Sequence, residues 1–412
     1  MESTSTEFDI IVWGATGFTG RLVVEYLLET YGVDKTLRWA IAGRNQAKLE
    51  ALKAEFGTTA GELAILTADS HKIDSLTELV NRTKVIISTV GPYALHGSAL
   101  VATCAETGTH YCDLAGEPQW IRKMIDQHEE TARQSGARIV PSCGFDSIPS
   151  DLGVFYLQNE AQKQFGTHCR RVKMRVKAMR GGASGGTIAS MMNAIEEARA
   201  DKKVARILVD PYSLCPKDFP RGPDKRDQGG PVADKDLEGW TAPFIMAGIN
   251  TKVVRRTNAL LGKPWGEEFS YQEAMWTGSG ITGYLKALQI TMALGGVFLA
   301  GSISILRNAM RKLFLPAPGE GPNEKERHNG FYKFIIHGKT DSNQVIKVSV
   351  LGDRDPGYGS TSKILGEAGV CLALDELQVE GGFWTPASAM GEALLKRLPA
   401  NAGLTFRVMG SE

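Results

Sequence analysis

Three glycines at fixed spacing near the amino terminus are the residues of this sequence best suited to hold a phosphate group. They lie in the run Gly14-Ala-Thr-Gly17-Phe-Thr-Gly20, which follows an apolar strand-like segment, 9–13, and precedes a helical pattern, 21–30. Glycines there allow a tight turn, and the free N–H groups at the start of the helix attract a pyrophosphate. We therefore expect dinucleotide binding, rather than a plain strand-to-helix turn, at Gly14, Thr16, Gly17, Phe18, Thr19 and Gly20.

The end of the second strand indicates which dinucleotide binds. An acidic residue there would bind the ribose hydroxyls of NAD, but the chain reads Ala42-Gly43-Arg44-Asn45. A guanidinium can pair with the 2′-phosphate of NADP and stack on adenine, so Arg44 predicts NADP(H). An arginine that only faces solvent is the alternative. Asp69, after the third strand, is expected to contact the adenine amine or to cap the next helix.

A second loop, which follows the fourth strand at the same sheet edge, is expected beside the nicotinamide half of the cofactor. Its predicted cofactor-binding residues are Thr89, Gly91, Pro92 and Tyr93. In a reduction the cofactor supplies the hydride, while the protein orients the acceptor and supplies a proton. Tyr93 and His96 are therefore the candidate catalytic residues, as hydrogen-bond donor and proton donor or relay. Glu117 and Asp146, after later strands, could line the same cleft or only cap helices.

The elements that must position these residues alternate between strand and helix up to about residue 145. Strand-like apolar runs lie at 9–13, 37–42, 63–67, 85–90, 110–114 and 138–141, with helical patterns between them. This alternation is typical of a parallel sheet with right-handed crossovers. We predict an α/β fold in which residues 1–150 form a Rossmann domain with a doubly wound parallel sheet.

The pattern changes after residue 150 to that of an α+β domain with an antiparallel or mixed sheet. Residues 171–179 alternate apolar residues with Arg171, Lys173, Arg175 and Lys177, as a half-buried strand with one wet face does. Two further strands are predicted at 331–337 and 345–351, and surface loops at 210–240 and 319–330. We assign 151–355 to this substrate or dimerisation domain and 356–412 to a segment that packs back on the Rossmann domain.

Charge and cysteine content exclude several classes of protein. The 412 residues include 47 Lys plus Arg and 46 Asp plus Glu, and this balance argues against nucleic acid as a partner. The six cysteines include no C-x-x-C pair, and the seven histidines show no metal-site spacing, so we predict neither disulfides nor a metal. The start of the chain lacks a signal-peptide pattern, so we expect an intracellular protein that is not secreted.

A run of 20 uncharged residues, 287–306, is long enough to be a membrane-span candidate. A basic amphipathic pattern over 303–315 follows it, and such a helix suits an anionic bilayer or a lipid droplet. One complete crossing would separate the tail from the Rossmann domain. We therefore expect peripheral, monotopic attachment through 285–315, with a hairpin turn near Gly295-Gly296 as one form. A buried core or dimer-interface helix is the alternative.

The chain as a whole resembles the saccharopine dehydrogenase-like oxidoreductases, a family that includes the trans-acting enoyl reductases of lipid biosynthesis. The resembling segments are 9–20, 42–44, 90–93, 113–117, 143–153, 184–187, 240–244, 318–322 and 385–387. The resemblance implies an NADP-binding Rossmann domain, a second domain for substrate or dimerisation, and a tail that returns to the first domain. It leaves the substrate open.

The resemblance and the apolar segment together predict an NADPH-dependent oxidoreductase that reduces an activated (enoyl) double bond. The expected substrate is a small-molecule or lipid acyl precursor, free or carrier-bound, met at a membrane or lipid-droplet surface, and a homodimer is one expected assembly. Two alternatives stay open: a catalytically weak NADP-binding scaffold, and a saccharopine-type amino-acid dehydrogenase, which would need converging cations. A hydrolase using Ser184 in a G-x-S-x-G run is disfavoured, because the acid and histidine follow in the wrong order.

Overall fold

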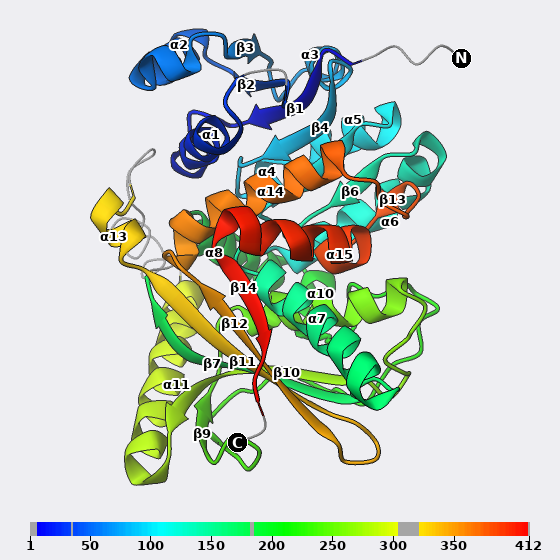
Figure 1. Ribbon diagram of the computed structural model, residues 1–412, viewed down its shortest axis with the longest axis vertical. Helices are drawn as coiled ribbons and strands as arrows, with labels where there is room; N and C mark the ends of the chain where they lie inside the picture. The colour runs from blue at the N-terminus through cyan, green and yellow to red at the C-terminus, as the bar shows by residue number, and fades with distance from the viewer. Residues whose placement is uncertain (1–5, 34–35, 182–184, 304–320, 411–412) are drawn as a thin grey trace.

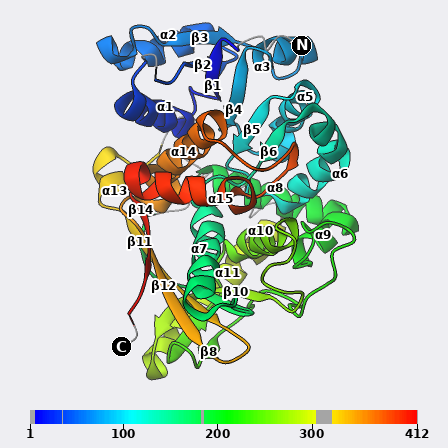
Figure 2. The ribbon, with the colours of Figure 1, turned by 45° about the vertical axis from the view of Figure 1, so that its right-hand side comes forward.

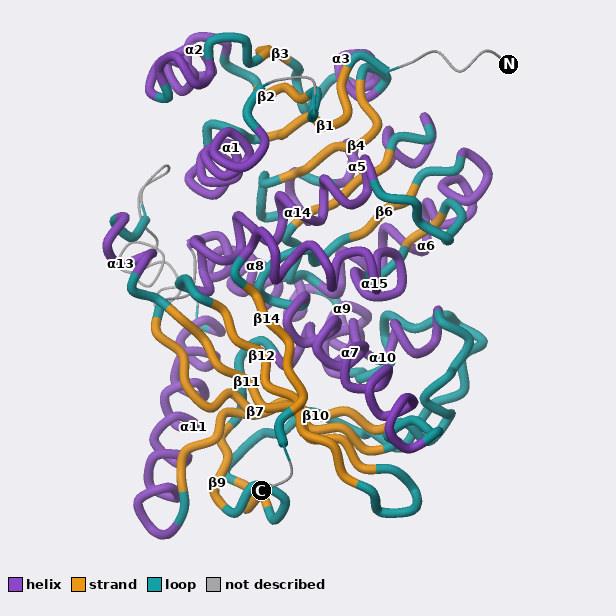
Figure 3. The backbone as a smooth tube through the Cα atoms, in the orientation of Figure 1, coloured by secondary structure: helices purple, strands orange, loops and turns teal. Residues whose placement is uncertain are grey.

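The strands of the protein form two seven-stranded sheets in a computed structural model that describes residues 6–33, 36–181, 185–303 and 321–410. One sheet lies above the other in Figure 1, and helices of the tail pass between them. Figure 3, in which strands are orange and helices purple, shows the two groups of strands as separate layers. Four of the predicted site residues, Thr19, Thr89, Gly91 and Tyr93, line a cavity at the junction between the sheets.

The upper sheet is parallel and follows the order β13-β6-β5-β4-β1-β2-β3. Its strands are β1 (Phe8–Trp13), β2 (Trp39–Gly43), β3 (Ala64–Thr67), β4 (Thr83–Ser88), β5 (His110–Asp113), β6 (Arg138–Val140) and β13 (Gly382–Phe383). Its helices are α1 (Phe18–Tyr31), α2 (Gln46–Glu55), α3 (Ile73–Val80), α4 (Tyr93–His96), α5 (Ser98–Thr107) and α6 (Pro118–Ser135), with a 3-10 turn at Gly57–Ala60. All six residues of β1 are buried, because helices cover both faces of the sheet. The first six strands have the order of a Rossmann sheet, which confirms the predicted fold class.

The lower sheet is mixed, as predicted, and follows the order β14-β12-β11-β7-β10-β9-β8. Its strands are β7 (Arg171–Arg180), β8 (Val232–Asp234), β9 (Gly239–Ala242), β10 (Ser270–Gly278), β11 (Phe331–Lys339), β12 (Val345–Gly352) and β14 (Leu404–Val408). Only the pair β7 and β10 is parallel among the described pairings of this sheet. Its helices are α7 (Ile148–Phe165), α8 (Gly185–Ala200), α9 (Lys202–Val209), α10 (Ala247–Leu260), α11 (Gly280–Ser302) and α13 (Glu324–His328). Strand β8 and helix α13 correct the predicted loops at 210–240 and 319–330.

The cationic face of β7 differs from the wet face that the alternation predicts. Val172, Met174 and Val176 are buried on the core face, as expected. On the other face, however, Arg175 is also buried, and its Nε donates to Asp234 Oδ2 at 2.7 Å. Lys173 pairs with Asp234 and Asp236. Asp234 and Asp236 lie in the 210–240 segment, which the sequence predicts as a loop. They neutralise Lys173 and Arg175 of this face.

The tail connects the two sheets. It contains π-helical turns at Pro356–Ser360 and Leu398–Ala402 and the helices α14 (Thr361–Leu374) and α15 (Pro386–Arg397). Figure 2 shows both helices between the sheets. Strand β13 extends the upper sheet beside β6, whereas β14 closes the edge of the lower sheet against β12. Because this strand of the upper sheet has only two residues, no periodic pattern in the sequence could reveal it.

A buried carboxylate holds α14 against α1. Glu367 accepts hydrogen bonds from the hydroxyls of Tyr26 at 2.6 Å and Tyr31 at 2.5 Å. Asn401 donates to its other oxygen at 3.1 Å, and Arg397 lies 3.4 Å from that oxygen. A buried carboxylate with this many donors is stabilised, and each donor would be left unsatisfied without it.

Helix α11 runs along the flank of the lower sheet (Figure 1), and Gly283, Ala287 and Gly301 are its only buried residues in the described structure. Its apolar 18-residue window has a mean hydropathy of 1.3, and only 11% of that window is buried. The alternative of a buried core helix is therefore wrong. The helix also continues through Gly295 and Gly296, which corrects the hairpin turn. Both the predicted amphipathic helix over 303–315, apart from Ile303, and Ser184 lie outside the described residues.

The two strands that flank α11 in the chain exclude one complete membrane crossing. β10 precedes the helix and β11 follows it, and both pair directly with β7. The two ends of the apolar segment are thus connected to the same sheet, on the same side of any membrane.

Glu367 gives a test of how the tail is held. Glu367→Gln keeps the shape but weakens hydrogen bonds to a charged group, so we expect the free energy of unfolding to fall by about 1–3 kcal/mol in urea titrations. Glu376→Gln, at an exposed position just beyond the same helix, is the matched control and should change it by less than about 0.5 kcal/mol. Equal effects of the two variants would contradict an anchoring role for Glu367.

Candidate active site at the junction of the two sheets

A cavity of about 360 Å³ lies between the carboxyl edge of the parallel sheet and the lower sheet. Loops after β1, β4, β5 and β6 form its upper wall, as the ligand site of an open α/β sheet requires. Residues of α8, α9, α10 and α11 form the other walls. Most of its lining side chains are apolar, including Met191, Ile195, Leu208, Phe244 and Ile249.

The glycine loop after β1 has the shape that a pyrophosphate requires. Gly14 has φ +85°, and a Cβ on Gly20 would lie 2.2 Å from the Gly14 carbonyl oxygen, so neither position accepts a side chain. Helix α1 starts after Gly17 without a side-chain cap and without an acidic residue in its first turn. Its first N–H groups are therefore available to an anion. Thr19, on that turn, lines the cavity, so the loop fits the phosphates of a dinucleotide.

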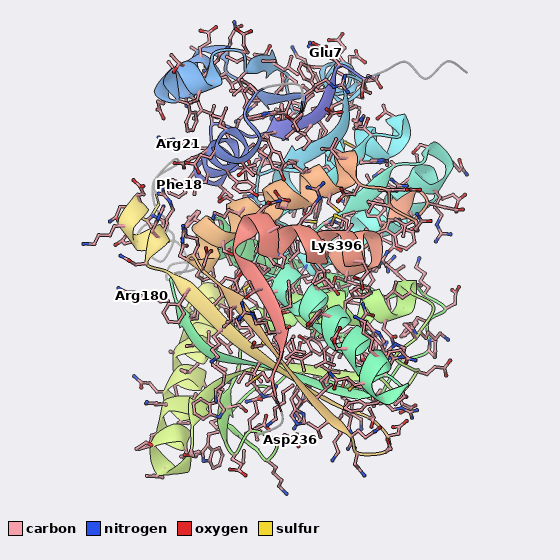
Figure 4. All side chains as sticks on the ribbon, in the orientation of Figure 1. Glu7, Phe18, Arg21, Arg180, Asp236 and Lys396 are labelled. Carbon is pink, nitrogen blue, oxygen red and sulfur yellow. The ribbon has the colours of Figure 1, made fainter. Side chains whose placement is uncertain are left out.

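The other predicted cofactor residues lie around this loop. Thr16 is exposed, and Phe18 packs edge-on against Tyr358, with 4.7 Å between ring centroids. Figure 4 labels Phe18 at the start of α1, above Arg180 at the end of β7 on the same side of the molecule. Thr89 donates from Oγ1 to the carbonyl oxygens of Trp13 and Gly14, both at 3.1 Å, and thereby ties the two loops together. Thr89, Gly91 and Tyr93 line the cavity.

Arg44 and Asp69 stand at the ends of β2 and β3. The Arg44 side chain is exposed directly after β2, and no described residue forms an ion pair with it. This arrangement leaves its guanidinium available to a 2′-phosphate. Asp69 instead accepts a hydrogen bond from the backbone N–H of His71 at 3.0 Å, so its side chain shapes the turn before α3. Asp69 does not cap α3, whose N-cap residue is Lys72 without a side-chain cap, and its contact with the adenine amine stays a prediction.

Tyr93 and His96, the two candidate catalytic residues, have other roles in the structure. The Tyr93 hydroxyl donates to the Ser88 carbonyl at 3.0 Å and accepts from the Leu114 N–H at 3.1 Å. Burial, helped by the Asp113 carboxylate, raises the pKa of Tyr93 well above its ordinary value. Its proton is thus committed to the protein, and we correct the assignment of Tyr93 as proton donor to one of positioning the loop. His96 is exposed on α4 and does not line the cavity, which corrects its assignment as well.

Glu117 is a helix cap and not an acid in the cavity. Its two carboxylate oxygens accept from the backbone N–H groups of Tyr93 at 2.8 Å and Ala94 at 3.0 Å. Ser190 of α8 donates to Glu117 as well, at 2.7 Å. The carboxylate therefore fixes α4 and connects it to α8. The sequence raised this role as an alternative, and the structure confirms it.

Asp146 is the ionisable residue that the cavity leaves without a partner. It follows β6 and lines the cavity, and no described residue donates a hydrogen bond or forms an ion pair with its carboxyl group. Burial raises the pKa of Asp146 from 3.8 to about 7, because the charged form loses solvation there. A carboxylic acid that is still protonated near neutral pH can donate a proton. The geometry thus favours Asp146 over Tyr93 and His96.

The tail positions the loop that carries Asp146. The N–H of Phe145 donates to Thr361 Oγ1 at 3.1 Å, and Thr361 is the first residue of α14. A Cβ on Gly144 would lie 2.7 Å from a methyl carbon of Leu114, so a side chain there would have to displace Leu114. Sequence reasoning missed Thr361, since nothing local shows that residues 216 positions apart in the chain meet.

Residues for two other chemistries are not found in the part of the chain that the structure describes. Among the described residues, no group of three or more His, Cys, Asp and Glu could hold a metal ion. All six cysteines are free and buried. The described lining of the cavity includes neither lysine nor arginine. Arg171, Lys173, Arg175 and Lys177 do not reach it, so converging cations for a tricarboxylic substrate are not found in this part of the chain.

Comparison with known proteins adds information that the geometry cannot supply. Residues 10–140 match the saccharopine dehydrogenase NADP binding domain. The chain is 40% identical over 421 residues to a Mycobacterium tuberculosis protein provisionally named a trans-acting enoyl reductase, with 99% of each chain covered. It is 36% identical over 410 residues to the trans-acting enoyl reductase of Mycobacterium ulcerans, with 97% of each chain covered.

Solved structures with the same fold have much lower sequence identity. Saccharopine dehydrogenase (L-Glu forming) from Saccharomyces cerevisiae matches with a TM-score of 0.55 and 13% identity, covering 97% of this chain and 99% of that one. Homospermidine synthase from Legionella pneumophila, in complex with NAD, matches with a TM-score of 0.52 and 9% identity, covering 97% and 91%. At these identities the likeness shows the fold alone.

Arg44 can be tested as the residue that reads the 2′-phosphate. Arg44→Ala removes a charge-assisted hydrogen bond, so NADPH binding should weaken by about 1–3 kcal/mol while NADH binding stays nearly unchanged. Calorimetric titration of both cofactors measures the difference. Arg21→Ala, on an exposed side chain paired with Glu55, is the matched control and should leave the preference intact. Equal losses for the two cofactors would show that Arg44 does not read the phosphate.

Proposed function

The chain belongs to the saccharopine dehydrogenase-like family of NADP-binding oxidoreductases, and from that premise we propose that it reduces an activated carbon–carbon double bond in an acyl or polyketide-derived lipid precursor at a membrane or lipid surface. The observation that carries this proposal is the cavity: its wall is apolar, it begins at the nucleotide loop, and it presents the unpaired carboxyl group of Asp146. Relatives named trans-acting enoyl reductases support the same class of acceptor.

The reaction needs a hydride, a proton and a dry site. When bound, NADPH supplies the hydride to the β-carbon of the enoyl group, a proton is added at the α-carbon, and NADP⁺ and the saturated acyl compound are released. In our proposal the loop from Gly14 to Gly20 binds the pyrophosphate, and Arg44 binds the 2′-phosphate. Asp146 donates the proton, and the apolar wall excludes water from the polarised acceptor. A thioester carbonyl, free or on a carrier protein, would provide the activation.

A saccharopine-type imine is a poorer fit to the same cavity. Such a substrate carries several carboxylates and would require cationic partners in the cavity wall. The described lining residues offer only the acid Asp146 as a charged group, which would repel a carboxylate once ionised. The scaffold alternative does not explain why a carboxyl group without a partner is kept in an apolar cavity, where its charged form is costly.

Helix α11 supports a lipid surface as the place of action. Ile281, Leu285, Met292, Leu299 and Ile303 are exposed by 44–69% and form one stripe, because their spacing returns to the same side of a helix. Residues 287–302 of the helix carry no charge on any side. A protein partner that contacts one side of the helix would therefore leave apolar residues on its other sides in water. A lipid phase can cover all of them. We propose peripheral attachment through 285–315, with the catalytic cavity on the same side as both chain ends of the helix.

Isotope transfer tests the reaction and the role of Asp146 together. Deuterium from 4-deuterated NADPH should appear at the β-carbon of an α,β-unsaturated acyl thioester. Asp146→Asn should lower kcat by roughly 10²–10⁴-fold, the range of a general acid. Because the acid form is required, the wild-type rate should fall as the pH rises above about 7, and the residual rate of the variant should lack this dependence.

Controls separate the role of Asp146 from damage to the fold. Asp74→Asn, on the exposed side of α3, should retain the wild-type rate and pH profile. Asp146→Asn should also melt at a higher temperature than wild type, by a margin that grows from about pH 4 to about pH 7 and is constant above it. The reason is that the unfolded wild-type chain releases the Asp146 proton from about pH 4, whereas the folded protein keeps it up to about pH 7, so the wild type alone loses stability over this range. A variant with unchanged kcat and pH profile would remove Asp146 from the mechanism.

Vesicle binding tests the role of α11. Replacing Leu285, Met292 and Leu299 with serine removes apolar surface from the exposed stripe, so co-sedimentation with phosphatidylglycerol vesicles should weaken by about tenfold or more. Ile73→Ser, at an exposed position of α3, is the control and should bind as wild type does. Unchanged vesicle binding, or a loss of dimers in analytical ultracentrifugation in its place, would contradict lipid attachment.

A further inference from the structure

We propose that one face of α8 is the binding site for the apolar chain of the substrate and that this site opens toward the lipid phase beside α11. The inference rests on the proposed function and deepens it, because it gives the tail of the substrate a place and a direction of access. The face, called the α8 wall below, consists of Gly186, Thr187, Ser190, Met191, Ala194 and Ile195.

The α8 wall has the geometry of a linear apolar site. Its members recur in pairs at intervals of four residues, so they lie on one side of the helix and follow it for roughly 14 Å. Although α8 lies between the two sheets, Met192 is its only buried residue in the part of the helix that the structure describes. A helix in this position normally buries an apolar face against protein. Here that face borders the cavity.

One part of the α8 wall is connected to the reaction site. Ser190 donates to Glu117, which caps α4 next to the nucleotide loops. The same cavity includes Thr19, Thr89 and Asp146. A thioester held between these residues would therefore have its chain beside α8.

The other part of the α8 wall meets α11. A Cβ on Gly301 would lie 3.1 Å from the terminal methyl carbon of Ile195, so α8 and the end of α11 are in close contact there. Phe298, one turn earlier on α11, lines the cavity and yet remains 45% exposed. It lies to the side of the outer stripe of α11, toward α8. One residue thus belongs to both the cavity and the helix that we place in the lipid surface.

These two connections favour a long acyl chain as the occupant. The chain has no charge to satisfy, and the α8 wall offers apolar contacts with few hydrogen-bonding groups. A substrate dissolved in a bilayer could pass beside Phe298 without crossing water, so its chain would never lose its apolar surroundings. The reactive end would enter first and stop at the nucleotide loops.

Photolabelling in lipid vesicles tests this site without requiring turnover. The reagent is a palmitoyl pantetheine thioester with a diazirine either at the chain end or next to the thioester, bound to the full chain with NADPH. Fragmentation mass spectrometry, which assigns the label to a single residue, should locate the chain-end label on Met191, on Ile195 or on Phe298 itself. The label next to the thioester should lie on the peptide with Asp146.

Substitution of one alanine on each side of the helix provides the matched pair. Ala194→Trp should fill the wall and reduce chain-end labelling by about tenfold, whereas Ala200→Trp, at the exposed end of α8, should leave it unchanged. Ala194→Leu is a smaller change that should give an intermediate loss of labelling. It replaces Ala194→Trp in the test if that variant does not fold. NADPH affinity should be the same in all three variants.

The outcomes distinguish this inference from the proposed function. Labelling of the α8 wall in a protein that reduces no enoyl thioester would support the acyl site and contradict the reaction. Chain-end labels confined to the outer stripe of α11, or labelling that Ala194→Trp does not change, would overturn the acyl site while leaving the reaction intact.

Discussion

The return of the tail to the parallel sheet is the constraint on which the site depends. Helix α14 is anchored to α1 through the buried carboxylate of Glu367, and its first residue, Thr361, binds the backbone of the loop that carries Asp146. The same segment continues to β14 at the edge of the lower sheet. One stretch of chain thereby sets the separation of the two sheets and the position of the acid between them. Without it the cavity would have an upper and a lower wall but no fixed distance between them.

The parts of the structure that could be predicted are those in which neighbouring residues determine the outcome. Strands such as β1 are continuous apolar runs because helices cover both faces, and the glycine loop has its own spacing. The two-residue strand β13 and the strand β8, in a segment rich in glycine and proline, carry no period long enough to detect. The alternation along β7 predicted an exposed Arg175, because its partner Asp234 is 59 residues away in the chain and leaves no local signal.

The predicted catalytic residues, Tyr93 and His96, differ from the acid that the structure favours for a related reason. The sequence shows which acidic residues follow strands, but it does not show which of them find hydrogen-bond donors. Glu117 finds two backbone N–H groups and becomes a cap, whereas Asp146 finds none in the described structure and keeps a raised pKa. Tyr93 had the right chemistry and the right loop, yet its hydroxyl is used within the protein. In our proposal the acid of the site is therefore the one whose carboxyl group the described neighbours leave unsatisfied.

The half-buried state of α8 has a practical consequence for handling the protein. An apolar face that borders an open cavity is stabilised by whatever apolar molecule fills it, in proportion to that molecule's concentration over its dissociation constant. Detergents have the alkyl chains that such a face accepts. If α11 lies in lipid as we propose, the detergent that extracts it would reach α8 beside Phe298, which lines the same cavity. Solubilised preparations would then be thermally robust and inactive at once. Their melting temperature and their inhibition would both increase with the length of the detergent chain.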